Sequence, residues 1–240
     1  MQISKRLEAV AAMVEPGSRL IDVGTDHGYI PIYLKSRGII ESALAMDINK
    51  GPLQRARENI MKSGFEADIK TRLSDGLSRA GKDPGDCVVI AGMGGPLTIK
   101  ILTEGENVLK AVRTLVLQPQ SEIAGVRYFL HDKGYRILNE NMVLDEGKYY
   151  VIIKAVRGRE CYERKCCYTY GCCLLRQRHP VLYAFLHREL KKYNKILKEI
   201  GDVSSRQAGE RKAELKDKIS EVLEALKVYG HSHMDQEDMI

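Results

Sequence analysis

Two apolar runs near the N-terminus constrain the fold more than any other part of this 240-residue chain. The first, at residues 20–24, is Leu-Ile-Asp-Val-Gly, and the second, at 43–47, is Ala-Leu-Ala-Met-Asp. Short apolar runs that end at an acid or a glycine are typical of buried parallel strands. Asp47 lies 23 residues after Gly24, the spacing at which a Rossmann-like domain places the carboxylate that binds a ribose diol. The two runs therefore predict a βαβ unit with a nucleoside site at its carboxyl end.

The turn between these runs indicates which nucleoside cofactor would fit. Its sequence is Gly24-Thr-Asp-His-Gly28, with two glycines instead of the three in the G-x-G-x-x-G turn that binds a pyrophosphate. Asp26 would repel a phosphate group but attract a cation. S-adenosylmethionine carries a sulfonium and an ammonium group and no phosphate, so the turn favours this cofactor over NAD. The residues expected to contact it are Gly24, Asp26, His27, Gly28, Asp47, Ile48, Asp75, Gly76, Gly92 and Met93.

Residues 1–157 alternate between patterns typical of strands and of helices. Strands are predicted at 19–23, 43–48, 67–73, 87–91 and 113–117, and helices at 29–36, 51–63, 96–103 and 122–133. This alternation implies right-handed βαβ units and a mostly parallel sheet. Two further strand-like runs, 135–144 and 148–156, are joined by Asp-Glu-Gly and predict an antiparallel hairpin. Five βα units closed by such a hairpin form the seven-stranded α/β fold of Rossmann-like methyltransferases.

The pattern changes after residue 157. Residues 180–200 and 210–229 carry apolar side chains three or four positions apart, which predicts two amphipathic helices. A short segment at 201–205 separates them, so an antiparallel, coiled-coil-like helical hairpin is expected. The expected organisation is a methyltransferase domain at 1–157, a basic helical hairpin at 158–230 and a flexible tail at 231–240.

The positive charge of the chain is concentrated in the expected hairpin. Residues 1–156 hold 21 Lys and Arg against 19 Asp and Glu, whereas residues 157–230 hold 17 against 10. This excess favours a polyanionic partner, and a solvated lysine-rich helix face is the alternative. The candidate contacts are Arg176, Arg178, Lys191, Lys192, Lys195 and Lys198.

The composition is that of a soluble globular protein, with 44% hydrophobic and 29% charged residues. No apolar run approaches the roughly 18 residues that a membrane helix needs, and the N-terminus lacks the features of a signal peptide. A cytoplasmic protein with no membrane contact and no obligate protein partner is therefore expected.

The loops after the fourth and fifth strands are expected to face the substrate, because ligands bind at this point of a parallel sheet. In the first loop, Ala-Gly-Met-Gly-Gly, Gly94 and Gly95 would let a flat substrate approach the backbone, and a packing turn is the alternative. In the second, Leu-Gln-Pro-Gln, the amide of Gln118 beside Pro119 suits the edge of a base, although a capped turn explains it equally well. The Asn/Asp-Pro-Pro-aromatic motif of enzymes that methylate exocyclic amino groups is absent.

Other candidate residues also have structural alternatives. Asp47 and Asp75 could cap helices, although Asn49 could take that role in place of Asp47, and His27 could bond the backbone instead of acting as a base. Tyr29 could stack on a nucleobase. The clustered cysteines do not have C-x₂-C zinc spacing, so reduced and partly buried thiols are predicted, with zinc binding as the alternative. They are Cys161, Cys166, Cys167, Cys172 and Cys173.

Three of these segments, in this order and on these strands, resemble the bacterial tRNA (adenine(22)-N(1))-methyltransferase family. They are Asp-Val-Gly-Thr-Asp-His-Gly-Tyr-Ile-Pro at 22–31, Ala-Gly-Met-Gly-Gly at 91–95 and Leu-Gln-Pro-Gln at 117–120. The predicted strand hairpin and the basic C-terminal helices are also similar to that family. The cysteine segment departs from the family, and Gln120 stands where an asparagine is expected.

The resemblance implies S-adenosylmethionine-dependent methylation of N1 of an adenosine in the D-arm of tRNA. On this interpretation Asp26 and Tyr29 are catalytic: Tyr29 stacks on the target base and Asp26 stabilises the cationic product. Tyr29, Gly94, Gly95, Gln118 and Pro119 would contact the substrate, together with Arg176, Arg178, Lys191 and Lys195. The alternatives are a methyltransferase acting on another RNA, a protein or a metabolite, and a non-catalytic RNA-binding module.

Overall fold

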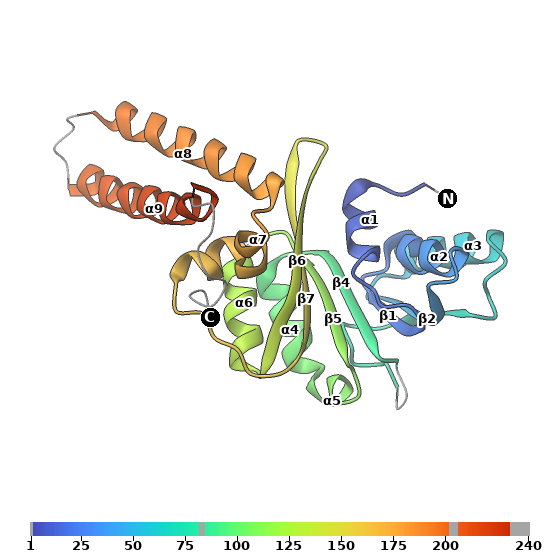
Figure 1. The fold of residues 1–240 in the computed structure, drawn as a ribbon. Helices are drawn as coiled ribbons and strands as arrows, with labels where there is room; N and C mark the ends of the chain where they lie inside the picture. The colour runs from blue at the N-terminus through green and yellow to red at the C-terminus, as the bar shows by residue number, and fades with distance from the viewer. Residues whose placement is uncertain (1, 82–84, 202–205, 231–240) are drawn as a thin grey trace. The chain divides into compact units, whose positions relative to one another are not determined.

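The computed structural model describes residues 2–81, 85–201 and 206–230. The chain divides into two compact units, Met1–Glu160 and Cys161–Ile240, whose elements are labelled in Figure 1. The tail predicted at 231–240 and residues 202–205 of the predicted helix connection lie outside the described residues.

The first unit is built on one seven-stranded sheet. Its order is β3-β2-β1-β4-β5-β7-β6; β1 to β5 pair in parallel, and β7 is antiparallel to both β5 and β6. The predicted α/β fold, a mostly parallel sheet closed by an antiparallel hairpin, is thereby confirmed. The strands are β1 (Ser18–Val23), β2 (Ile40–Asp47), β3 (Ile69–Leu73), β4 (Cys87–Met93), β5 (Thr114–Pro119), β6 (Tyr135–Asp145) and β7 (Lys148–Arg157).

The helices of this unit begin and end where local sequence favours it. The hydroxyl of Ser4 accepts the backbone N–H of Leu7 at 3.3 Å and caps the first helix, and Pro96 lies in the first turn of the fourth. The second helix has the predicted bounds, and Gly38, at φ +67°, follows its end. The helices are α1 (Lys5–Ala11), α2 (Tyr29–Ser36), α3 (Lys50–Lys62), α4 (Gly95–Glu104), α5 (Glu106–Leu109) and α6 (Ile123–Asp132).

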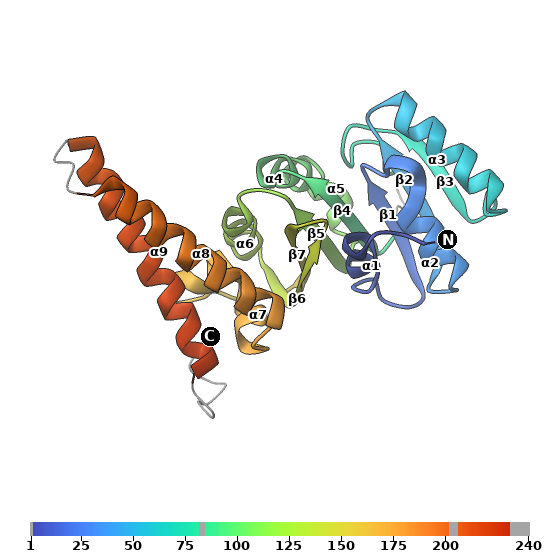
Figure 2. The same cartoon turned by 90° about the horizontal axis from the view of Figure 1, so that it is seen from above.

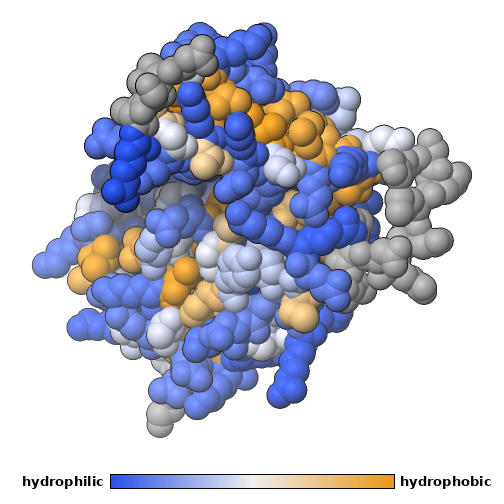
Figure 3. Space-filling view, turned by 90° about the vertical axis from the view of Figure 1, so that its left-hand side faces the viewer, coloured by the Kyte–Doolittle hydropathy of each residue, from blue (hydrophilic) through white to orange (hydrophobic). Residues whose placement is uncertain are grey.

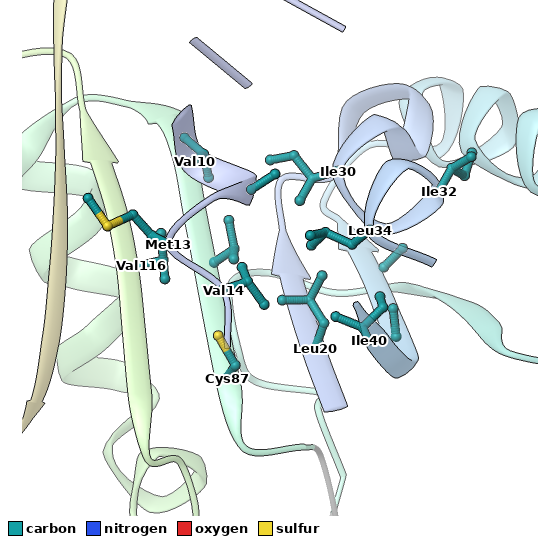
Figure 4. Close-up of a cluster of buried hydrophobic side chains, with 14 of the residues drawn as sticks. Val10, Met13, Val14, Leu20, Ile30, Ile32, Leu34, Ile40, Cys87 and Val116 are labelled. Carbon is teal, nitrogen blue, oxygen red and sulfur yellow. The ribbon is translucent and has the colours of Figure 1, made fainter. Parts of the chain in front are cut away.

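Side chains on both faces of the sheet are buried, as expected for a parallel sheet covered by helices. On one face Val116 of β5 packs in a cluster with Val10 of α1 and Leu34 of α2 (Figure 4). On the other face α4 contacts α6 and strands β4 and β5. Figure 2 shows α4 to α6 on the opposite side of the sheet from α1 and α2. The carboxyl ends of the central strands are left for a binding site.

The connection from β3 to β4 differs from the predicted series of five βα units. No helix follows β3 in the described residues, and a turn takes its place. The Ser74 hydroxyl donates to the carbonyl of Gly76 at 2.9 Å and accepts the N–H of Arg79 at 3.1 Å, so one side chain closes the turn. Serine is a common helix cap, but Ser74 closes a turn and not a helix.

The second unit contains two long helices that lie side by side and run in opposite directions (Figures 1 and 2). The first has the predicted bounds, and the second begins four residues before the predicted start. Leu182 and Leu186 of one and Leu215 and Val222 of the other are buried, as the apolar spacing requires. Coiled-coil packing between them stays a prediction. The helices are α8 (Pro180–Ile200) and α9 (Arg206–Gly230), preceded by the π-helix η2 (Cys167–Gly171) and by α7 (Cys172–Arg176).

Reduced cysteine side chains gather in and just before the short helices of this unit. Cys166, Cys167, Cys172 and Cys173 are buried and Cys161 is exposed. Hydrogen bonds with the thiols of Cys166 and Cys172, together with burial, raise the pKa of Cys167. Within the described ranges, no three His, Cys, Asp or Glu side chains are placed to hold a metal ion.

The length and apolar character of the helices, and the hydropathy of the surface, are the features relevant to the expectation of no membrane contact. None of the helices in the described part of the chain combines the length and the apolar character needed to cross a bilayer. The face seen in Figure 3 is mainly hydrophilic, and its apolar side chains gather in separate strips.

Gly95 should tolerate no side chain, because α4 starts against the loop that follows β5. A Cβ atom there would lie 2.5 Å from the carbonyl oxygen of Ser121 and 3.0 Å from that of Glu122. We expect Gly95→Ala to lower the free energy of unfolding by about 1–3 kcal/mol in urea titrations. Gly125→Ala in α6 is the matched control: its Cβ meets no atom within 4 Å, and it should raise stability by about 0.5–1 kcal/mol. Equal effects would contradict this account.

Candidate active site

A pocket of about 570 Å³ lies at the carboxyl ends of β1, β2 and β4, within the first unit. This volume falls in the range of about 300–1,000 Å³ that is usual for small-molecule sites. Of the residues predicted to bind a cofactor, those that line the pocket are Gly24, Asp26, Asp47, Ile48, Asp75, Gly76, Gly92 and Met93. Tyr29, the predicted stacking residue, lines it as well.

The loop after β1 forms one wall of the pocket and is tied to the neighbouring strand. The N–H groups of Gly24 and Thr25 both donate to the carbonyl of Met46, at 2.8 and 2.9 Å. Gly24 has φ +76°, and a Cβ atom there would lie 2.3 Å from Cε of Met93, so the loops after β1 and β4 approach each other closely. The positive φ is what favours glycine at this position, because the flexible end of the Met93 side chain could move aside.

Asp22 lies in the pocket wall and was not predicted as a site residue. Its carboxylate is buried and accepts a 2.5 Å hydrogen bond from the Thr25 hydroxyl. Burial, with a smaller contribution from the negative charge of Asp47, raises the pKa of Asp22 to about 6 against the opposing effect of the Thr25 hydrogen bond. Two acids thus face one cavity, which suits a ligand that carries positive charge or hydroxyl donors.

Asp47 ends β2 with its side chain at the pocket, and only 8% of its surface is exposed. One carboxylate oxygen accepts the N–H of Asn49 at 2.7 Å. Asn49 is the N-cap residue of α3, but its side chain makes no capping hydrogen bond. Asp47 is therefore held in place by local backbone and retains acceptor capacity toward the pocket, as a ribose diol requires.

Asp26, His27 and Tyr29 form the outer rim of the same loop. The Asp26 carboxylate is 62% exposed and lies 3.1 Å from the Arg55 guanidinium and 3.5 Å from Nε2 of His27. The His27 ring stacks on Tyr29 with centroids 5.1 Å apart and planes 6° apart, and the His27 carbonyl accepts from Asn59 at 2.9 Å. His27 therefore supports the Tyr29 ring, and it does not line the pocket.

Arg6 reaches the pocket from α1 and connects it to the ends of β4 and β5. Its Nη1 donates to Oε1 of Gln118 at 2.9 Å, and the N–H of Gly92 donates to the same oxygen at 3.2 Å. The guanidinium carbon also lies 5.5 Å from the centroid of the Tyr150 ring. Gln118 is fully buried, so its amide holds the Gly92 loop and Arg6 and does not face the pocket.

Several residues predicted to touch a ligand lie behind the pocket wall. Gly28 packs against α3, where an added Cβ atom would lie 3.5 Å from Cβ of Ala56, and Gly95 donates its N–H to the carbonyl of Ser121. Gly94 and Pro119 are also absent from the lining, whereas Gln120 is part of it. The reason is that β5 continues to Pro119, which keeps Gln118 and Pro119 inside the sheet. Of the glycines at 92, 94 and 95, Gly92, near the end of β4, is the one that lines the pocket.

The basic residues predicted to bind a polyanion lie in the second unit. Arg176 and Arg178 are exposed near the end of α7, and Arg176 donates to Sγ of Cys172 at 3.7 Å. Lys191 and Lys195 are exposed on α8.

The pocket also contains residues that sequence reasoning missed. Asp22 and Thr25 lie inside the strand–turn segment at 22–31, and the acid at the end of a strand was the signal that could have identified the first. Arg6 belongs to no motif and reaches the site only through tertiary packing. The unpredicted lining residues are Arg6, Leu7, Asp22, Val23, Thr25, Ile30, Asn49, Ser74, Ala91, Leu97, Ile101 and Gln120.

Comparison with known proteins places this site among methyltransferases. Residues 3–153 match the family described as a methyltransferase domain. The tRNA (adenine(22)-N(1))-methyltransferase of Bacillus subtilis is 34% identical over 158 residues, which span 66% of this chain and 66% of that enzyme. Two solved structures are also similar to this chain. The Streptococcus pneumoniae protein Sp1610 in complex with S-adenosyl-L-methionine has a TM-score of 0.83 at 36% identity, covering 94% of this chain and 100% of that one. The B. subtilis M1A22 tRNA methyltransferase TrmK has a TM-score of 0.83 at 28% identity, covering 94% and 99%.

The raised pKa of Asp22 makes stability depend on pH with a defined sign. Its carboxyl keeps its proton to a higher pH in the folded chain than in the unfolded one, so stability falls as the pH rises from about 4 to 6. We expect Asp22→Asn, which can still accept from Thr25, to remove a difference of about 2 kcal/mol across this range. Urea titrations at pH 4 and pH 6.5 measure it, with the exposed Asp132→Asn as control. Parallel pH profiles for wild type and Asp22→Asn would show that Asp22 titrates normally.

Proposed function

The chain belongs to the methyltransferase-domain family and, within it, to the tRNA (adenine(22)-N(1))-methyltransferases, and from this we propose that it methylates N1 of adenosine 22 in the D-arm of tRNA. The pocket carries the proposal, because it combines the glycine turn after β1 with an acid at the end of β2. A cytoplasmic location follows from a tRNA substrate.

S-adenosylmethionine fits the donors and acceptors of this pocket. The buried Asp47 would accept the ribose hydroxyls, Asp75 and Gly76 would border the adenine, and Ile48, Leu97 and Ile101 offer apolar surface to its ring. Asp22 and Asp26 give the methionine end of the pocket a negative charge that favours a sulfonium and an ammonium group. When bound, the cofactor supplies an electrophilic methyl group.

The task of the chain's own residues is to orient the target base; they do not need to activate it by deprotonation. N1 of a neutral adenine already carries an in-plane lone pair, so no side chain must first remove a proton. Orientation alone can contribute about 7–11 kcal/mol to lowering a reaction barrier. Tyr29, supported by the His27 ring, would stack on the base, and Asp26 would stabilise the positive charge that the methylated base acquires.

Arg6 and Gln118 act as positioning residues in this proposal. Gln118 was predicted to contact the substrate, but its buried amide instead holds both the Gly92 N–H and the Arg6 guanidinium. This arrangement fixes the loop after β4, where base and cofactor meet in folds of this type. Gln120, at the pocket surface, takes the place of Gln118 as the amide that could contact the edge of the base.

The excess of basic residues in the second unit supports a role in binding the tRNA backbone. Contacts between Lys or Arg and phosphates depend strongly on salt and carry little sequence information. A metabolite-methylating enzyme would have no use for them. The acceptor and positioning groups retained in the pocket likewise argue against a non-catalytic RNA-binding module.

Asp47→Asn should weaken cofactor binding while leaving the fold intact, because an asparagine can still accept the N–H of Asn49. We expect the dissociation constant of S-adenosylhomocysteine to rise about 10- to 100-fold, as measured by isothermal titration calorimetry. Asp132→Asn, which removes the same charge from an exposed site on α6, should bind like wild type. Equal affinity for Asp47→Asn would show that this carboxylate does not hold the ribose.

The substrate assignment is tested by incubating the protein with labelled S-adenosylmethionine and an unmodified tRNA transcript that has adenosine at position 22. We expect label at N1 of that adenosine, mapped by nuclease digestion and mass spectrometry. A transcript with guanosine at position 22 is the matched control and should take no label. If the protein binds the cofactor but transfers no methyl group to either transcript, the proposed substrate is wrong and the cofactor assignment still holds.

A further inference from the structure

The basic charge of the second unit is concentrated on one of its two long helices. Helix α8 holds five Lys and Arg against two Glu, whereas α9 holds six Lys and Arg against five Asp and Glu. All five basic side chains of α8 are exposed, and one of its two acids, Glu189, is buried. Glu189 lies 3.6 Å from Arg188 and 3.5 Å from Lys192, so its charge offsets those two bases more than the other lysines of the helix.

One exposed row on α8 joins aromatic and basic side chains. Tyr183, His187, Lys191 and Lys195 follow each other at four-residue intervals, and all four are exposed. Residues four positions apart are neighbours on a helix surface, so the row passes continuously from two rings to two ammonium groups. The surface therefore offers flat apolar rings next to positive charge.

The two rings are held at the N-terminal end of this row. The Tyr183 and His187 rings meet edge to face with centroids 4.4 Å apart, and Tyr183 lies 5.0 Å from the Tyr229 ring of α9. The Tyr229 hydroxyl donates to the carbonyl of His179 at 3.1 Å, which anchors that ring to the start of α8. Tyr183 nevertheless keeps 45% of its surface exposed. A half-exposed ring fixed by its neighbours loses little conformational entropy when a partner stacks on it.

We propose that Tyr183 and His187 form a platform on which an unpaired base of the RNA substrate stacks, while Lys191 and Lys195 contact the phosphates beside that base. This inference rests on the proposed function, because it takes RNA as the partner. Base stacking on aromatic rings combined with a positively charged track is the usual means of binding unpaired nucleotides. A folded tRNA offers such bases in its loops. An acidic protein could pair with the lysines, but its carboxylates offer no flat ring that would stack on Tyr183 and His187.

The sequence contains no tryptophan, which allows a direct optical test in the full chain. Tyr183→Trp places the only indole at the platform, and we expect its fluorescence to be quenched as an unmodified tRNA transcript binds. Leu223→Trp on α9 is the matched control, since Leu223 is 46% exposed on the same pair of helices. Its fluorescence should change little over the same titration.

A second variant separates stacking from packing between the helices. Tyr183→Leu keeps an apolar side chain against Tyr229 but has no ring, and we expect the dissociation constant for the transcript to rise about 10-fold. Unchanged thermal unfolding by circular dichroism would show that the variant is folded. Wild-type affinity of Tyr183→Leu, or Tyr183→Trp fluorescence that stays unquenched when the transcript binds, would overturn the platform.

The possible outcomes also distinguish this inference from the proposed function. Transfer of methyl groups to adenosine 22 without quenching at position 183 overturns the platform alone. Quenching by the transcript without methyl transfer overturns the proposed function and leaves the platform standing. A blue shift of the Tyr183→Trp emission on concentrating the protein without RNA would assign this surface to a second copy of the chain, and would overturn the proposal.

Discussion

The carbonyl oxygen of Met46 accepts hydrogen bonds from both Gly24 and Thr25, and the geometry of the pocket depends on this pair. It joins the turn after β1 to the end of β2, so Asp22 and Asp47 are brought to one cavity from two consecutive strands. The turn can make both bonds because Gly24 adopts a positive φ and leaves room for Met93. The negative charge of the pocket wall therefore depends on the two backbone hydrogen bonds that join the turn after β1 to β2.

Local sequence patterns predicted the fold well, because each element depends on its own spacing of apolar residues and on nearby Gly and Pro. The bounds of α2 and α8 are those predicted, and the seven strands lie where expected. The fold prediction was wrong where one side chain determines the local structure. After β3 the Ser74 hydroxyl closes a turn in place of the expected helix. In the site, side-chain direction at strand ends could not be predicted. One extra pair of residues in β5 turns Gln118 inward and leaves Gln120 at the pocket.

The chain separates two kinds of binding between its two units. The first unit holds a pocket of mixed polarity with acids at its wall, where burial makes each hydrogen bond specific. The second holds exposed cations, whose attraction for a polyanion is long-ranged and easily screened. For the same reason, the count of charges along the sequence predicts a polyanionic partner but does not identify residues that recognise a particular base or RNA structure.

The contacts of Arg6 link the beginning of the chain to its middle. Its backbone N–H donates to Asp145 at 3.0 Å and its guanidinium to Gln118, residues that are 139 and 112 positions further along. On the ribosome, α1 emerges first and can pack against α2, but its contacts with β5 and the β6–β7 hairpin have to wait until those strands have been made. The earliest-synthesised helix is thus among the last to settle, and the nascent protein acquires a complete pocket only after its whole first unit has left the exit tunnel.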